Sequence, residues 1–388
     1  MIWHWIIFGI LAFIVFLENI CNLSKKNVIR MCTIIVLIVI FLSSIRWNQK
    51  IADWDSYYNV FQAISINKFS DLFFRNVWDF EFLFNLLMRI IKATTDNYLH
   101  VQIVMALIAI GFFYKSLLYF NTDVQYRDEK YGFGGHYIAL ALLFAWATEC
   151  MNLYAVRTSL ATSICLFSIR YIEKRDWKRF GICTLIAFGF HMSAIVFVPA
   201  YFIYNIRLDV KQISKYLFGA VLLSAIGAPA LIRVAGLLGG RIGHKADGYN
   251  YALGSDYFGS VFTASGFIVL LKAFANTILV VLVVLYITSR VKNDMGARPR
   301  VNGICNLYLF GAMLQVVFLP YSMLVARIAI FYINQQFFIL PVLLQTQKKS
   351  LGNRLFIFIG LLAYAGLKMY MLLRGAEGYW TFNNIFQY

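Results

Sequence analysis

Apolar runs of about 20 residues recur along this chain, and they constrain its fold more than any other feature. Residues 2–20 form one run, and residues 27–44 form another after a short basic break. A helix of about 20 apolar residues crosses the hydrocarbon core of a bilayer, whereas strands that cross it alternate apolar and polar side chains. The runs here are continuous. They therefore predict an all-α, polytopic helical membrane protein.

The composition supports this prediction, because 61% of the 388 residues are hydrophobic and 14% are charged. We expect about 10 transmembrane spans in a single integral membrane domain, residues 1–388, with no soluble domain of ordinary size between them. The first span has no basic segment before it and no small-residue cleavage site after it, so we expect it to be retained. The predicted spans are residues 2–20, 27–44, 98–120, 135–151, 154–172, 216–238, 261–289, 303–319, 322–345 and 355–373.

A further apolar stretch, residues 180–206, is interrupted by His191 and Pro199. Lys and Arg gather in cytoplasmic loops, and the basic clusters of this chain share one face if the stretch crosses the membrane an even number of times. We therefore predict a short helical hairpin near 180–206, with both termini outside. The clusters are Lys25, Lys26 and Arg30; Arg127 and Lys130; Lys174, Arg175, Lys178 and Arg179; Arg290, Lys292, Arg298 and Arg300; and Lys348, Lys349 and Arg354.

This topology leaves two larger loops on the outer side, residues 45–97 and 239–260. Both carry Lys and Arg, which the tendency of positive residues to stay inside disfavours there. An anionic ligand on the outer face would explain these cations, and so would pairing with the Asp and Glu residues of the same loops. The first loop opens with an unusual mixture of charged and aromatic residues, from Arg46 to Tyr58.

Several function classes are disfavoured. The net charge of +17 is spread through short loops, so it indicates membrane topology and not a nucleic-acid partner. The six cysteines have no Cys-x-x-Cys spacing, which argues against a disulfide framework or a zinc site. The sequence has no phosphate loop, no Gly-x-Gly-x-x-Gly, no His-Glu-x-x-His and no Gly-x-Ser-x-Gly. An ATP-driven pump and a soluble-type hydrolase are therefore disfavoured.

Three ionisable residues fall in or near predicted spans, where a charge costs about 2.5 to 3.5 kcal/mol at a helix centre. Arg157 begins a span on the outer side and suits either a phosphate, held by paired hydrogen bonds, or extension to the interface. His191 lies where the predicted hairpin turns, and suits a general base, a donor to a pyrophosphate, or simple packing. Arg327, near the outer half of a span, suits an anion or an ion pair with a loop carboxylate.

Together with two elements of the first loop, these residues form a recognisable order. The order resembles that of the EpsG-like branch of the Wzy-type polysaccharide (O-antigen) polymerases, over about residues 40–345. That family often has a Gly shortly before the first Asp, where this chain has Ala52. The elements are Arg46, Asp53 to Tyr57, Glu81 to Phe84, Arg157 to Ala161, Phe190 to Ser193, and Arg327 to Tyr332.

The resemblance implies a glycosyltransferase in the bacterial inner (cytoplasmic) membrane, with its active site facing the periplasm. Such an enzyme joins oligosaccharide repeat units carried on undecaprenyl pyrophosphate, and makes the O-antigen of lipopolysaccharide, capsule or exopolysaccharide. Its partners would be the lipid-linked oligosaccharide, membrane lipid and a chain-length regulator protein. Both termini and the loops 45–97 and 239–260 would then be periplasmic.

This implied reaction assigns roles to the candidate residues. Pyrophosphate would be held by Arg157 and Arg327, with Arg46 assisting. The acceptor hydroxyl would be activated by Asp53, Asp55 or His191, with Glu81 as the runner-up carboxylate. Sugar rings would pack on Trp54, Tyr57, Tyr58 and Trp78. We expect no cofactor and assign no metal site, although the spacing Asp53-x-Asp55 would also suit a divalent cation.

Two other classes share some of these features. A flippase or transporter of lipid-linked oligosaccharide would also need intramembrane arginines and polar cavities, but the halves of this chain show no inverted repeat or matching broken helices. An O-antigen ligase-type transferase uses the same donor and would look alike in sequence. Both stay open as alternatives.

Overall fold

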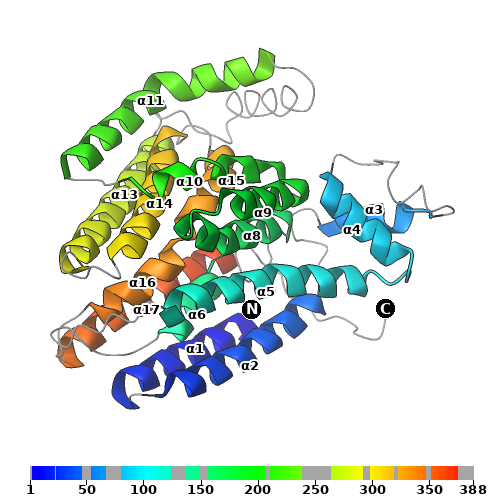
Figure 1. The fold of residues 1–388 in the computed structure, drawn as a ribbon, viewed down its shortest axis with the longest axis horizontal. Coiled ribbons are helices and arrows are strands. Elements are labelled where there is room, and N and C mark those ends of the chain that lie inside the picture. The colour runs from blue at the N-terminus through cyan, green and yellow to red at the C-terminus, as the bar shows by residue number, and fades with distance from the viewer. Residues whose placement is uncertain are drawn as a thin grey trace. The chain divides into compact units, whose positions relative to one another are not determined.

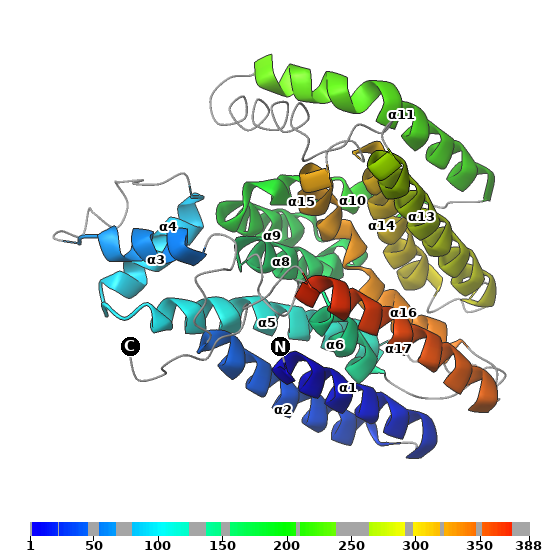
Figure 2. The same ribbon diagram turned by 180° about the vertical axis from the view of Figure 1, so that it is seen from behind.

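The computed structural model describes residues 2–21, 23–45, 54–66, 80–123, 137–148, 156–206, 210–237, 264–291, 298–318, 322–346 and 351–374. The regular elements in these ranges are all helices (Figures 1 and 2). They are α1 (Ile2–Cys21), α2 (Lys25–Ser44), α3 (Trp54–Ala63), α4 (Phe82–Lys92), α5 (Leu99–Asp123), α6 (Ile138–Trp146), α8 (Val156–Glu173), α9 (Trp177–Phe190), the 3-10 helix η2 (Met192–Phe197), α10 (Ala200–Ile203), α11 (Val210–Leu237), α13 (Ala264–Val291), α14 (Arg298–Val317), α15 (Ser322–Ile333), α16 (Gln336–Gln345) and α17 (Leu351–Arg374).

Five helical segments among the described residues are long and apolar enough to cross a membrane. They coincide with predicted spans 2–20, 27–44, 98–120, 322–345 and 355–373, so the all-α class and these spans are confirmed as candidates. The total of about 10 spans and the periplasmic termini stay predictions. The segments are Ile2–Cys21, Lys25–Ser44, Leu99–Phe120, Ile328–Gln345 and Gly352–Leu373.

The chain divides into two compact units. Unit 1 comprises residues 1–198 and 337–388, and unit 2 comprises residues 199–336. The prediction of a single integral membrane domain stays a prediction. The loop predicted at 45–97 contains α3 and α4, which both belong to unit 1, whereas the loop 239–260 lies outside the described residues.

Side-chain contacts fix the directions of the helices in unit 1. Tyr137, just before α6, donates its N–H to Glu18 Oε1 at 3.0 Å, near the end of α1. At the other end of α6, Trp146 Nε1 donates to the carbonyl of His4 at 2.9 Å. The helices α1 and α6 are therefore antiparallel, and their last and first residues respectively share one end of the unit.

The helices α5 and α8 run parallel, so their last turns lie side by side. Arg170 Nη2 donates to the carbonyl of Lys115 at 3.0 Å, and Tyr119 OH donates to Glu173 Oε2 at 3.2 Å. Tyr114 OH in turn donates to the carbonyl of Ile29 in the first turns of α2, at 3.2 Å. The start of α2 and the ends of α5 and α8 are thus neighbours, as expected if the basic residues beside them face one side of the membrane.

A hairpin follows α8 and reverses at His191. Asp176 caps α9 by accepting from Arg179 N at 3.0 Å, and α9 lies beside α8 in both views (Figures 1 and 2). His191 is extended, with φ −155° and ψ 116°, and so ends the helix. The chain then returns, because the ring of Phe197 in η2 lies 6.2 Å from the ring of Phe180 near the start of α9. The chain therefore reverses within residues 177–197, whereas a membrane hairpin over the whole of 180–206 stays a prediction.

In unit 2, α14 packs closely against its neighbours because small residues allow it. A Cβ at Gly311 would lie 2.7 Å from Tyr332 Cβ and 3.0 Å from Ile333 N, so the backbones of α14 and α15 are in near contact. Asn306 of the same helix donates to the carbonyl of Ile206 at 2.6 Å and so fixes the segment after α10. Close approach at small residues is the usual basis of helix packing in membranes.

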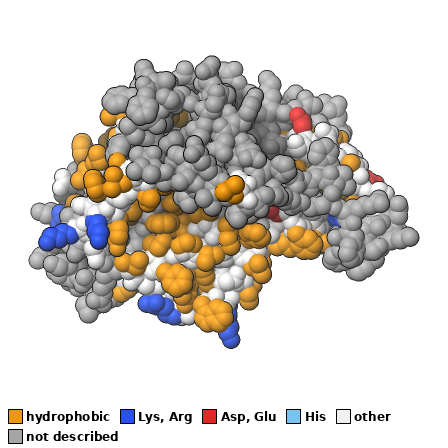
Figure 3. Space-filling view, turned by 90° about the horizontal axis from the view of Figure 1, so that it is seen from above, with side chains coloured by type: hydrophobic (Ala, Val, Ile, Leu, Met, Phe, Trp, Pro, Cys, Tyr) orange, Lys and Arg blue, Asp and Glu red, His pale blue; other side chains and the backbone are white. Residues whose placement is uncertain are grey.

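Many large apolar side chains of the described helices are exposed. Figure 3 shows a broad area of hydrophobic side chains on the face in view, with Lys and Arg at its edges. On α2, for example, Ile34, Leu37 and Phe41 are exposed. Large exposed apolar patches are uncommon on soluble proteins, but they suit a surface that faces lipid.

The replacement Gly311→Ala should destabilise unit 2. The added methyl group would meet backbone atoms, which cannot move aside as a flexible side chain can, and overpacking typically costs about 1–3 kcal/mol. We expect a lower melting temperature for the purified protein in detergent. Gly219→Ala in α11, where nothing lies within 4 Å of the added Cβ, is the matched control and should not lower it. Equal melting temperatures for the two variants would contradict the close α14–α15 contact.

Candidate active site

Glu81 lies at the centre of a buried polar cluster in unit 1. Its Oε2 accepts from Arg157 Nη1 at 2.8 Å, and its Oε1 lies 3.2 Å from His191 Nδ1 and accepts from Met192 N at 3.1 Å. The side chains of Glu81, Arg157 and His191 are only 10%, 16% and 10% exposed. One carboxylate therefore joins three segments that are distant in the sequence.

Arg157 is held on several sides. It lies in the first turn of α8, and its Nε donates to Tyr57 OH on α3 at 3.0 Å. The guanidinium carbon also lies 4.7 Å from the ring centre of Phe80 and 5.9 Å from that of Phe84. Aromatic faces attract a cation, and more strongly where water is excluded. The guanidinium is thus fixed by one carboxylate, one phenol and surrounding rings.

His191 reaches Glu81 because the backbone leaves the helix there. Its extended conformation separates α9 from η2 and directs both its ring and the following N–H at the same carboxylate oxygen. The second ring nitrogen, Nε2, is buried and has no hydrogen-bond partner in the described part of the chain. Buried polar atoms are usually paired, so this nitrogen is a candidate to bind a ligand or to act in catalysis.

Local packing brings α4 to this cluster. Asn85 Nδ2 donates to the carbonyl of Phe80 at 2.8 Å and so fixes the residues that flank Glu81. A Cβ at Gly189 would overlap the side chain of Leu83, which means that α4 and α9 approach closely only because residue 189 has no side chain. The glycine therefore lets Glu81 come within reach of His191.

The surroundings of Glu81 keep it ionised. Burial by itself raises the pKa of this carboxyl, but the hydrogen bond from His191, the charge of Arg157 and the N–H of Met192 lower it more. The net effect lowers the pKa from its ordinary 4.5 to about 2. Glu81 is therefore a carboxylate, and a hydrogen-bond acceptor only, at neutral pH.

The structure unites some of the predicted site residues and separates others. It brings together Glu81, Arg157, His191 and Tyr57, whereas Asp55 points to solvent from the first turn of α3. Arg46, Asp53 and Trp78 lie outside the described residues, as does the side chain of Arg327, whose backbone is in α15. The roles predicted for these four residues stay predictions.

The predicted sugar platforms are mostly covered by other rings. Trp54 is 3% exposed and stacks on Tyr58, with ring centres 5.3 Å apart, and Tyr98 packs edge-on against both. Tyr57 is buried beside Phe84, while Tyr58 is half-buried. Sugar binding by these residues stays a prediction. The sequence analysis named Phe84 only as the end of the element Glu81 to Phe84, and it did not name Phe80, which lies just before α4.

No group of three or more His, Cys, Asp or Glu side chains in the described ranges could hold a metal ion. Asp53 lies outside those ranges, so the alternative of a cation at Asp53-x-Asp55 falls outside the described residues.

The cluster and the basic residues between α8 and α9 lie at opposite ends of these two helices. The helix α8 begins beside Glu81 and runs for 18 residues, or about 27 Å, to the basic residues Lys174 and Arg175. The helix α9 begins at the basic residues Lys178 and Arg179 and leads back to His191. If basic residues mark the cytoplasmic side, the polar cluster belongs to the other side.

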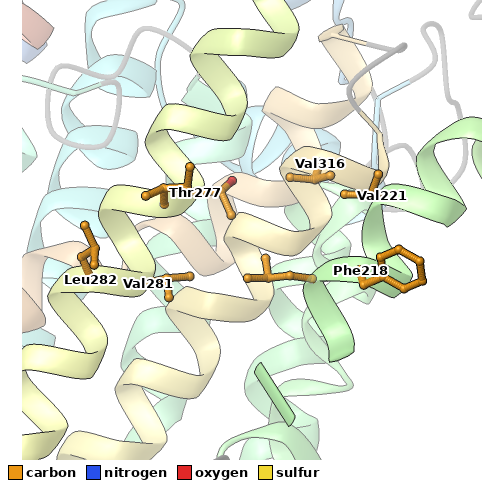
Figure 4. Close-up of a pocket in the computed structure, with 8 residues that line it drawn as sticks. Phe218, Val221, Thr277, Val281, Leu282 and Val316 are labelled. Carbon is orange, nitrogen blue, oxygen red and sulfur yellow. The ribbon is translucent and has the colours of Figure 1, made fainter. Parts of the chain in front are cut away.

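Unit 2 contains a separate apolar groove of about 280 Å³ between α11, α13 and α14 (Figure 4). Phe218 and Val221 line it from α11, Val281 and Leu282 from α13, and Val316 from α14. The hydroxyl of Thr277 on α13 is buried there, with no hydrogen-bond partner in the described residues. Such a lining suits hydrocarbon far better than a polar ligand.

The lowered pKa of Glu81 predicts how the stability of unit 1 depends on pH. Because the folded pKa lies below the unfolded one, the contribution of Glu81 is complete above about pH 4.5 and is lost as the pH falls toward 2, a total of about 3 kcal/mol. The wild type should therefore lose its advantage over Glu81→Gln as the pH falls through this window. Melting curves in detergent would measure this, with the exposed Asp96→Asn as control. A pH-independent difference would contradict the ionised cluster.

Comparison with known proteins gives one match. Residues 29–388, nearly the whole chain, match the family model described as the EpsG family. Neither the curated proteins nor the solved structures gave a match. Since the family match covers far more than half of the sequence and includes Glu81, Arg157 and His191, the chain belongs to the EpsG family.

Proposed function

We propose that this protein is a glycosyltransferase that polymerises oligosaccharide repeat units linked to undecaprenyl pyrophosphate, at the periplasmic face of the bacterial inner membrane. Membership of the EpsG family supports a polysaccharide polymerase-type role. The observation that carries the proposal is the cluster of Arg157, Glu81 and His191. It combines a cation for a leaving pyrophosphate with a base for an attacking hydroxyl.

The reaction forms a bond between the acceptor hydroxyl oxygen and the anomeric carbon of the donor sugar. The bond from that carbon to the phosphate oxygen breaks, and its electron pair leaves with undecaprenyl pyrophosphate. Positive charge beside the leaving group is often the largest single contribution to such a step. Arg157 supplies it in this proposal, because a guanidinium donates paired hydrogen bonds to phosphate oxygens.

His191 is the base in this proposal. Its buried Nε2 has no partner among the described residues, so a hydroxyl that enters the cluster would meet an available acceptor. The proton passes from the hydroxyl to Nε2 and then to water. Asp55 is exposed and fits this role less well, whereas Asp53 remains an alternative base. A positioned base typically contributes about 10²- to 10⁴-fold in rate.

The orientation of the helices supports a periplasmic site. The basic residues that connect α8 and α9 lie at one end of that hairpin and the cluster lies at the other. The groove in unit 2 has the chemistry that a polyprenyl chain requires, since its lining is almost wholly apolar. Arg46 and Arg327 are further candidates for the pyrophosphate, and the repeat unit, the linkage and the kind of polysaccharide stay open.

Two other functions share this chemistry. A flippase of lipid-linked oligosaccharide would bind the same pyrophosphate without breaking a bond, and an O-antigen ligase-type transferase would pass the sugar chain to a different acceptor. Glycosyl transfer needs a base for the acceptor hydroxyl, and a histidine beside a buried carboxylate supplies one. Proton-coupled transporters also use His and carboxylate groups, so the assay must detect the bond that is formed.

The proposal predicts that Arg157→Ala and His191→Gln each abolish the ladder of polymers. Purified protein in proteoliposomes, supplied with a lipid-linked repeat unit, should give a product ladder with release of the pyrophosphate lipid. Loss of charge stabilisation or of the base should each reduce the rate by about 10²-fold or more. Gel analysis of labelled products provides the measurement.

Arg179→Lys serves as the matched control, because Arg179 is 69% exposed and lies at the opposite end of α9. It should leave the ladder unchanged. Movement of the lipid across the bilayer without any ladder would instead identify a flippase, and transfer to a lipid A-type acceptor only would identify a ligase. Full activity of both site variants would show that the cluster is structural.

A further inference from the structure

The contacts and the low pKa of Glu81 make it a weak base. Both oxygens already accept hydrogen bonds, from Arg157 on one side and from Met192 N and the His191 ring on the other. Its pKa of about 2 is far below neutral, whereas an efficient base has a pKa near the working pH. The catalytic role considered for Glu81 from the sequence therefore does not suit its surroundings.

The same contacts determine which nitrogen of His191 carries a proton. An ionised carboxylate can only accept, so the 3.2 Å contact between Oε1 and Nδ1 requires that Nδ1 carry the hydrogen. In a neutral imidazole the other nitrogen is then an acceptor. That nitrogen, Nε2, is the buried atom without a partner in the described residues.

The backbone reinforces this arrangement. Met192 N–H donates to the same Oε1, so the carboxylate oxygen is fixed by the residue next to the histidine as well as by the ring. The break between α9 and η2 at His191 makes both donors point the same way. Rotation of the ring would lose the contact with Oε1, and the cluster therefore favours a single orientation.

We propose that Glu81 is a positioning residue: it holds His191 in the Nδ1–H form, with Nε2 directed at the acceptor hydroxyl, while its other oxygen orients Arg157. The catalytic role of His191 in this inference rests on the proposed function. During transfer, the hydroxyl proton moves to Nε2, Glu81 stays ionised, and its charge stabilises the imidazolium that forms. One carboxylate thus aligns the base and the cation of the same site.

The tautomer can be measured without any substrate. Full-length protein labelled with ¹⁵N-histidine and placed in lipid nanodiscs would give ring-nitrogen signals by NMR, with His191 assigned by its loss in His191→Gln. At alkaline pH, where imidazole is neutral, we expect a protonated Nδ1 and an unprotonated Nε2. In Glu81→Gln the amide can donate as well as accept, so the proton should redistribute toward Nε2.

Kinetic measurements then separate the effect of Glu81 on His191 from its effect on Arg157. We expect Glu81→Gln to lower kcat by about 10²- to 10⁴-fold, as loss of a positioned base does. Arg157→Lys keeps a cation next to Glu81, so it should leave the His191 tautomer unchanged and raise KM for the lipid-linked donor. A merely structural role for Glu81 would lower the melting temperature without changing the tautomer.

A proton on Nε2 in the wild type, or the same tautomer in wild type and Glu81→Gln, would overturn the inference. If Glu81→Gln does not fold, a wild-type spectrum with the proton on Nε2 still overturns the inference. An Nδ1–H signal that depends on Glu81 in a protein that makes no polymer would count against the proposed function and leave the positioning role intact. Polymer formation with unchanged kcat in Glu81→Gln would count against the positioning role and leave the proposed function intact.

Discussion

The ion pair between Arg157 and Glu81 is the interaction on which the candidate site depends. A charge that is largely withdrawn from water is stable only with a counter-ion and further hydrogen bonds. Arg157 obtains these from Glu81 and from Tyr57, and Glu81 obtains its own from His191 and Met192. The need to neutralise one guanidinium therefore holds α3, α4, α8 and the break after α9 in a single arrangement.

The length and direction of α8 and α9 connect this cluster to membrane topology. Each helix has the basic residues of the connecting segment at one end and a member of the cluster at the other. The contacts of α1, α2, α5 and α6 give unit 1 the same polarity, since Glu18, Ile29 and Tyr119 all lie near helix ends that adjoin basic segments. The distribution of charge and the position of the polar cluster are thus two consequences of one set of helix directions.

The helical class could be predicted from the sequence because the length of an apolar run is a local property. The reversal at His191 was also predictable, since the histidine and Pro199 interrupt an apolar stretch. The exposure of Asp55 could have been inferred from the spacing of Trp54, Tyr57 and Phe61, which places these rings on one side of a helix and Asp55 away from it. The family resemblance placed Glu81, Arg157 and His191 in one site, but it did not predict their direct contacts. Arg157 and His191 lie 76 and 110 residues beyond Glu81, and only packing brings them together.

The charge balance of the cluster explains why one arginine is insufficient for the proposed substrate. Glu81 cancels the charge of Arg157, so an arriving pyrophosphate would meet a nearly neutral site and would also be repelled by the carboxylate. Glu81 remains held by His191 and Met192 even if Oε2 is displaced from the guanidinium. A diphosphate must therefore find additional positive charge elsewhere in the protein. Arg46 and Arg327 are the two further arginines that the motif order of the sequence offers, and their role in holding a pyrophosphate stays a prediction.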